Sequence, residues 1–133
     1  MRLDELYNIA EKQNIDVDYF PMDECTSVST PYGIAIDVDK LNNSIEEKVC
    51  LAHELGHCEL GAFYNIFSPY DIKSRQEYRA NKWAASTLIP FCELQEALES
   101  GYTEIWELAE LFGVSEEFMN IAIDIYRRQG KLL

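Results

Sequence analysis

The chain has 133 residues, of which 47% are hydrophobic, and this length and composition suit one domain with a single core. Its 24 Asp and Glu residues outnumber its 11 Lys and Arg residues, so the formal net charge is −13. This balance disfavours a nucleic-acid binder, because clustered Lys and Arg make most phosphate contacts, and it equally disfavours docking on an anionic membrane. A basic partner would instead be attracted.

The beginning of the chain lacks the apolar run that a signal peptide needs, because Asp4 and Glu5 interrupt it. No stretch approaches the roughly 18 uninterrupted apolar residues of a membrane helix. The cysteines lie far apart without a CxxC pair, and we expect them to be free thiols: Cys25, Cys50, Cys58 and Cys92. These features together predict a cytoplasmic protein.

Residues 1–40 are expected to form an N-terminal helix and a small sheet. Apolar residues at helical spacing predict the helix over 3–13. A two-residue alternation predicts a strand over 15–20, and an apolar, β-branched run predicts a second strand over 33–38, with a short strand near Val28 between them. The strand 33–38 is a candidate edge onto which an extended peptide could add by backbone pairing.

A long helix is predicted over 44–60. Ser44 and Glu47 fit a capping box at its start, and Gly61 fits the usual left-handed stop at its end. The following segment, 61–73, carries several aromatic residues without a helical period. A loop of this length in a compact domain is more often functional than idle.

The second half of the chain reads as helical. A second long helix is predicted over 75–89, closed by Pro90, and a helical tail over 91–133. Trp83 and Trp106 are interpreted as core residues. The order of helix, small sheet and then helices predicts an α+β fold with a small mixed or antiparallel sheet, in a single domain covering 1–133.

The tail has a superficial helix-turn-helix pattern, with Gly113 between two amphipathic segments. From Phe91 to Tyr126, however, it contains nine acidic residues and no Lys or Arg. A recognition helix without basic residues would be repelled by phosphate. Core packing, or a face that docks a protein partner, is therefore favoured over direct binding of nucleic acid.

The long helix over 44–60 contains the sequence His53-Glu54-Leu55-Gly56-His57, which has the form H-E-x-x-H. Residues four apart project from one helix face, about 6 Å along the axis, close enough for two imidazoles to share one ion. Zinc accepts neutral imidazole nitrogens, and three protein ligands leave a fourth position for water. Glu54 follows the first ligand, so its carboxylate is the candidate catalytic base.

The chain has no further histidine, so the third ligand is a carboxylate or a cysteine. Glu77 is the preferred candidate, because Asn81 lies one turn later on the same face and could orient a histidine ring. Glu77 could instead belong to a capping box that begins at Ser74. Glu59 projects away from the metal face, whereas Cys50 lies one turn before His53 and remains an alternative thiolate ligand.

With HELGH at 53–57 and the run EYRANKWAASTLIP at 77–90, the sequence resembles the ImmA/IrrE family of metallopeptidases. The resemblance extends from about Gly33 to Pro90. It implies a zincin-like fold and a small zinc protease of the gluzincin kind, with His53, His57 and Glu77 as ligands. One departure is Arg79, at a position where many relatives carry Glu.

The family resemblance implies a zinc-dependent endopeptidase that inactivates a transcriptional repressor. Two points remain open from the sequence. The first is whether the protein cleaves its target or is a binding module that neutralises a regulator by contact alone. The second is which group stabilises the oxyanion, for which Tyr64 and Tyr70 are candidates. A helix-turn-helix repressor is the expected protein partner, and manganese or iron could replace zinc on these ligands.

Overall fold

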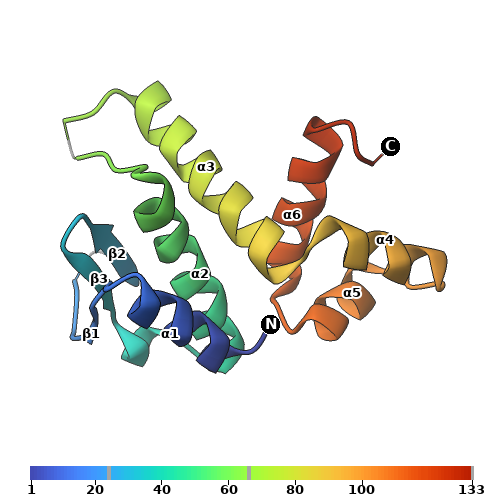
Figure 1. Ribbon diagram of the computed structural model, residues 1–133, viewed down its shortest axis with the longest axis horizontal. Coiled ribbons are helices and arrows are strands. Elements are labelled where there is room, and N and C mark those ends of the chain that lie inside the picture. The colour runs from blue at the N-terminus through green and yellow to red at the C-terminus, as the bar shows by residue number, and fades with distance from the viewer. Residues whose placement is uncertain (24, 66, 133) are drawn as a thin grey trace.

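The computed structural model describes residues 1–23, 25–65 and 67–132. A small sheet and the first helix lie at one end of the molecule and the last three helices at the other, with two long helices between them (Figure 1). The elements in chain order are α1 (Leu3–Lys12), β1 (Val17–Tyr19), β2 (Ser27–Thr30), β3 (Gly33–Ile36), the 3-10 turn η1 (Val38–Lys40), α2 (Ser44–Leu60), α3 (Tyr70–Leu88), α4 (Phe91–Glu99), α5 (Ile105–Phe112) and α6 (Glu116–Arg128). The predicted α+β class with a small mixed sheet is confirmed.

The sheet has the strand order β1-β3-β2 among the described residues. β1 pairs with β3 in parallel, and β2 pairs with β3 antiparallel, with Ser27 opposite Ile36 and Ser29 opposite Ile34. The prediction that the strand over 33–38 offers a free edge is therefore wrong. The residues of β3 are the most apolar of the three strands and are mostly buried. This burial accounts for the central position of β3 and leaves β2 at an edge.

The first long helix occupies the predicted range, but its cap differs from the prediction. The side chain of Asn43 accepts a hydrogen bond from the backbone N–H of Glu46, so Asn43 is the N-cap and Ser44 the first helical residue. Asn competes well with Ser at this position. At the other end Gly61 adopts φ 61°, the left-handed conformation expected for a helix stop.

The second long helix begins at Tyr70, five residues before the predicted start, and ends at Leu88. Pro69 precedes its first turn, and the four residues from Tyr70 to Lys73 continue the helix without a break. The connection after α2 is correspondingly shorter than predicted. Glu77 therefore lies in the interior of α3, where it cannot cap a helix start, and the capping-box alternative for Glu77 is wrong.

The helices α2 and α3 approach each other closely at Gly56. A Cβ atom on Gly56 would lie 2.6 Å from the carbonyl oxygen of Ala80 and 3.1 Å from its Cα. Only glycine on one helix and a small residue on the other allow the two backbones to come this near. The contact fixes the position of α3 along the axis of α2 and so determines which residues of the two helices face each other.

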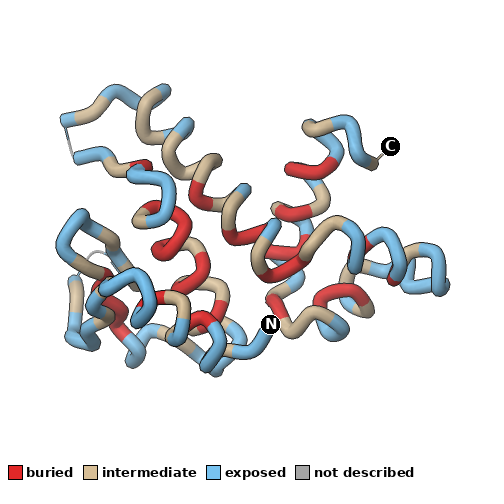
Figure 2. Tube along the Cα trace, in the orientation of Figure 1, coloured by how far each residue is buried: buried red, intermediate tan, exposed pale blue. Residues whose placement is uncertain are grey.

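The buried residues gather where α2 meets the sheet and where α3 packs against α2 and α6 (Figure 2). Trp83 packs partly buried against this core, as predicted. Trp106 is 57% exposed, so its assignment to the core is wrong. The buried face of α5 carries Leu108 and Ala109, and Trp106 lies two residues before Leu108, on the other side of the helix.

The helical tail is joined to the rest of the molecule by polar contacts as well as by the core. Lys48 is buried, and its ammonium donates to the carbonyl oxygens of Met1 and Phe112. The hydroxyl of Tyr126 donates to the carbonyl of Ile89, 2.6 Å away. All four cysteines are free, as predicted. Within the described ranges no helix has the length and apolar character needed to cross a bilayer.

Candidate metal centre

The two histidines of the motif face the same point in space. His53 and His57 lie one turn apart on α2, and their ring centroids are 4.8 Å apart with an interplanar angle of 81°. Their Nε2 atoms are separated by 3.2 Å. His57 is buried and His53 is half-buried, so both rings are held by the protein around them.

Each ring is oriented by a hydrogen bond at its other nitrogen. Nδ1 of His57 donates to the carbonyl oxygen of Ala62, 2.5 Å away, in the segment that follows α2. Nδ1 of His53 lies 2.7 Å from the side-chain oxygen of Asn81 on α3. Because a proton on Nδ1 leaves the Nε2 lone pair free, both partners favour the tautomer that binds a metal through Nε2.

Glu77 completes the group from α3. Its Oε2 atom lies 2.7 Å from Nε2 of His53, and its Oε1 atom lies 3.2 Å from Nε2 of His57. The helical periodicity of α3 places Asn81 one turn beyond Glu77. One face of α3 therefore contacts the Nε2 atoms of both histidines through Glu77 and Nδ1 of His53 through Asn81. In the described part of the chain, His53, His57 and Glu77 are the one group whose His, Cys, Asp or Glu atoms converge in this way.

The donor set fits a divalent ion. In a tetrahedral zinc site with Zn–N distances of about 2.0–2.1 Å, two ligand nitrogens lie about 3.3 Å apart. The observed separation of 3.2 Å between the two Nε2 atoms is close to that value. Two imidazoles and one carboxylate are also the ligand types of catalytic zinc sites that retain an open position. The arrangement therefore has the chemistry and the dimensions of a three-ligand metal site.

The metal-free group is also an ion pair. Burial alone would lower the pKa of His53, but its hydrogen bond to Glu77 and the negative charges of Glu54 and Glu77 outweigh burial and raise that pKa. Burial alone would raise the pKa of Glu77, but hydrogen bonds from His53, His57 and Tyr64 lower that pKa well below its usual value. The carboxylate of Glu77 is thus ionised and available as a ligand.

Glu54 is buried and lines one cavity with His57 and Glu77, and two serines of the sheet bind its carboxylate. The hydroxyl of Ser27 donates to one carboxylate oxygen at 2.6 Å, and the hydroxyl of Ser29 donates to the other at 2.8 Å. No sequence motif marks these serines as part of the site. The alternation Ser27-Val28-Ser29 in a short strand carries the signal, because residues two apart in a strand share one face.

The two tyrosines proposed for the oxyanion differ in position. The hydroxyl of Tyr64 donates to Oε1 of Glu77 at 2.6 Å, and its ring lies 6.2 Å from that of His57. Tyr70 is 85% exposed at the first turn of α3, two turns before Glu77. Tyr64 therefore lies at the candidate site, in a cavity of about 130 Å³ that it lines with Glu54, Glu77 and the edge strand β2.

Neither rival ligand, Cys50 or Glu59, belongs to the converging group of His53, His57 and Glu77. Burial raises the pKa of the Cys50 thiol, so this cysteine is held in the neutral form, which is a poor metal ligand. Glu59 is exposed on α2. Arg79 donates to the side chain of Gln76 and to the carbonyl of Leu60, so it faces away from the two histidines.

Comparison with known families tests the resemblance independently of this geometry. Residues 10–124 match a peptidase family described as the IrrE N-terminal-like domain. The chain belongs to this family. The family match covers the sheet, both long helices and most of the tail, and it supports a function of the metallopeptidase type for this IrrE N-terminal-like protein. Neither a curated protein nor a solved structure matches the chain at a significant level.

Proposed function

We propose that this protein is a zinc-dependent endopeptidase that cleaves a protein substrate, with a helix-turn-helix transcriptional repressor as the expected target. The observation that carries the proposal is the convergence of the Nε2 atoms of His53 and His57 with the carboxylate of Glu77, beside a cavity that Glu54 also lines. A structural metal would need no carboxylate base at its side and no cavity for a substrate.

In this proposal His53, His57 and Glu77 are the metal ligands and Asn81 orients the ring of His53. A divalent ion bound there would supply a Lewis acid for the scissile carbonyl and would lower the pKa of a water molecule. Glu54 would accept a proton from the attacking water molecule and would pass it to the amine nitrogen of the leaving group as the carbon–nitrogen bond breaks.

Tyr64 is the proposed donor to the developing oxyanion. Its hydrogen bond to Glu77, together with burial and nearby negative charge, raises the pKa of Tyr64 to about 12. The hydroxyl therefore keeps its proton at neutral pH, as a hydrogen-bond donor must. Its position in the lining of the cavity, hydrogen-bonded to Glu77, supports this role over Tyr70, which is 85% exposed.

The edge strand β2 is the proposed docking line for the substrate backbone. Ser27 and Ser29 on this strand contact Glu54, so a peptide paired along β2 would pass directly beside the catalytic base. This role replaces the one predicted for the central strand β3. Among the described residues β2 pairs with β3 alone, so one of its two edges has no strand partner.

The decisive experiment is the Glu54→Gln variant, which removes the base and keeps the size of the side chain. We expect it to fold, to bind one zinc ion, and to lose cleavage of the cognate repressor by roughly 100-fold or more. Metal content, circular dichroism and mass spectrometry of repressor fragments measure these three properties. Substantial cleavage by Glu54→Gln would refute the role of Glu54.

The same variant separates the endopeptidase from a metal-containing binding module that neutralises the repressor by contact. If Glu54→Gln still relieves repression in cells while producing no fragments, contact alone is sufficient and the second function holds. The metal is assigned by elemental analysis of protein purified without chelator, because the two-His-one-carboxylate set also accepts manganese or iron.

A further inference from the structure

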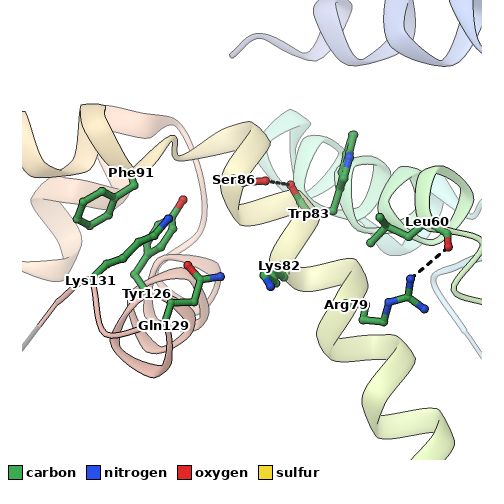
Figure 3. A pocket seen from close by; sticks show the side chains of 9 residues that line it. All are labelled: Leu60, Arg79, Lys82, Trp83, Ser86, Phe91, Tyr126, Gln129 and Lys131. Atoms are coloured by element: carbon green, nitrogen blue, oxygen red, sulfur yellow. Dashed lines mark hydrogen bonds between the residues drawn. The ribbon is translucent and has the colours of Figure 1, made fainter.

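A second cavity lies on the opposite side of α3 from the ligand group. It has a volume of about 460 Å³ and is formed by α3, the end of α2, the start of α4 and the end of the chain (Figure 3). Its lining residues are Leu60, Arg79, Lys82, Trp83, Ser86, Phe91, Tyr126, Gln129 and Lys131. The volume is in the usual range for pockets that bind small molecules.

The charge of this cavity is opposite to that of the molecule. Three of the eleven basic residues of the chain line it, Arg79, Lys82 and Lys131, whereas none of its described lining residues is acidic. The net charge of the whole chain is −13. A cluster of cations in an otherwise acidic protein selects an anion, because the rest of the surface repels it.

The walls between the cations are aromatic. The rings of Phe91 and Tyr126 meet edge to face with centroids 5.2 Å apart, and Trp83 lies across the cavity from them (Figure 3). The ammonium of Lys131 lies 5.4 Å from the centroid of Phe91 and 5.6 Å from that of Tyr126. Flat aromatic walls favour a flat apolar ligand body, which can stack on them.

One polar atom of the lining lacks a partner. The side-chain oxygen of Gln129 is buried, and within the described residues nothing donates a hydrogen bond to it. An unpaired buried acceptor destabilises the protein, and because Gln129 lines the cavity, a rotation of its side chain would let a ligand N–H or O–H group pair with this oxygen. The nearby hydroxyls are already engaged, since Tyr126 donates to Ile89 and Ser86 to Trp83.

We propose that this cavity is a binding site for a small aromatic carboxylate that carries a hydrogen-bond donor. The carboxylate would pair with Lys82 and Lys131, the ring would lie between Trp83 and the Phe91–Tyr126 pair, and the donor would reach Gln129. The site is independent of the metal centre, so its binding is expected in metal-free protein as well.

The test uses indole-3-acetate as the probe and neutral indole-3-acetamide, which has the same ring and nearly the same shape, as its control. Both are titrated into ¹⁵N-labelled protein while the two tryptophan indole N–H signals are followed by NMR. We expect indole-3-acetate to shift the Trp83 signal saturably, with at least tenfold higher affinity than the amide. The signal of the exposed Trp106 should remain unchanged.

The double variant Lys82→Met and Lys131→Met removes two exposed cations, and we expect it to weaken indole-3-acetate binding at least tenfold. Lys12→Met, an exposed lysine on α1, is the matched control and should bind as the wild type does. The proposal is overturned if Trp83 shows no saturable shift, if acid and amide bind equally, or if the double variant binds with unchanged affinity. The acid–amide comparison in the wild type decides the question even if the double variant is poorly folded.

Discussion

At the scale of single residues, the carboxylate of Glu54 is held at both oxygens by hydroxyls of one strand. Ser27 and Ser29 determine where this carboxylate lies relative to His53 and His57, because each makes a short hydrogen bond to a charged acceptor. These serines touch neither the ligand group nor, in the proposed mechanism, the reacting atoms. In the proposed mechanism they are therefore positioning residues for Glu54.

Replacing Ser27 by Ala is expected to lower kcat roughly 10- to 100-fold, because a misplaced base transfers protons poorly. KM and zinc content should stay near the wild-type values, since neither the strand backbone nor the ligand group changes. Steady-state kinetics on a peptide that contains the cleavage site measure the two constants separately. Ser27→Thr retains a hydroxyl in a strand and should recover most of the activity; a Thr variant as impaired as Ala would show that the hydroxyl is not the relevant group.

The pair formed by His53 and Glu77 has a pH signature in chelator-treated protein. The pKa of His53 is raised above the ordinary value of 6.5, so its contribution to stability is complete below that pH and is lost as the pH rises through the folded-state pKa. The pKa of Glu77 is lowered from 4.5, so its contribution is present above that pH and is lost on acidification. The pair should stabilise the metal-free protein most between about pH 4.5 and 6.5.

Urea unfolding of metal-free wild type and of Glu77→Gln across pH 4.5 to 8.5 measures this contribution as a difference between the two proteins. We expect the wild type to exceed the variant most in the acidic part of that range, with a smaller difference at the alkaline end. A difference that grows steadily toward pH 8.5 would contradict the assigned pairing.

Residues of the candidate site that lie on the same helix could be predicted together from the sequence. The H-E-x-x-H spacing alone placed His53, Glu54 and His57 on one helix, and the one-turn spacing of Glu77 and Asn81 put them on one face of another. The contacts of Ser27, Ser29 and Tyr64 could not be predicted, because they depend on how β2 and the segment after α2 pack against the motif helix. Local spacing carries no information about such contacts between elements.

At the scale of elements, the distance between α2 and α3 depends on Gly56. Any larger residue there would meet the backbone of Ala80, which cannot move aside as a flexible side chain could. The helices would then separate and move Glu77 away from the two histidines. This close approach explains why a glycine, a poor helix former, occupies the middle of α2.

Gly56→Ala is therefore expected to weaken zinc binding at least tenfold and to lower the free energy of unfolding by about 1–3 kcal/mol, the cost of overpacking, despite the better helix propensity of alanine. Competition with a chromogenic chelator measures zinc affinity, and urea titration measures stability. Ala52→Gly, elsewhere on the same helix, tests helix propensity and a small cavity alone, and it should leave zinc affinity much less affected. Unchanged zinc affinity in Gly56→Ala would refute this account of the helix spacing.

The elements themselves were predicted best where the local signals agreed. The range of α2 and the left-handed Gly61 followed from pattern and stop signal together. The start of α3 was placed too late, because Ser74 and Glu77 imitate a capping box while Pro69, which actually precedes the helix, carries no side-chain cap. The central position of β3 required strand pairing, which the sequence of a single strand does not specify.

At the scale of the whole molecule, the candidate metal centre joins parts of the chain that are distant in sequence. His53 and His57 come from α2, Glu77 and Asn81 from α3, and Ala62 from the segment between the helices. A bound ion would therefore crosslink the folded state, and because the unfolded chain lacks the arrangement, the binding free energy adds to stability.

Saturating zinc is expected to raise the Tm of the chelator-treated protein. Free zinc at 100 times its Kd adds about 2.7 kcal/mol to stability, which for a chain of this length corresponds to roughly 10 °C. Differential scanning calorimetry in the presence of increasing zinc measures the shift. Glu77→Gln should show a much smaller increase, and an unchanged Tm for the wild type would argue against a metal centre that spans both helices.

If a substrate pairs with β2 as proposed, the edge position of this strand limits which substrates can be cleaved. Main-chain pairing along Ser27–Thr30 requires a substrate segment whose amide and carbonyl groups are free to form hydrogen bonds. In a helix or in the interior of a sheet, these backbone groups are already hydrogen-bonded. An endopeptidase that binds its substrate in this way should leave folded domains intact and cleave the extended linker between them. Cleavage of a two-domain substrate by this protein would then yield two intact domains rather than many small fragments.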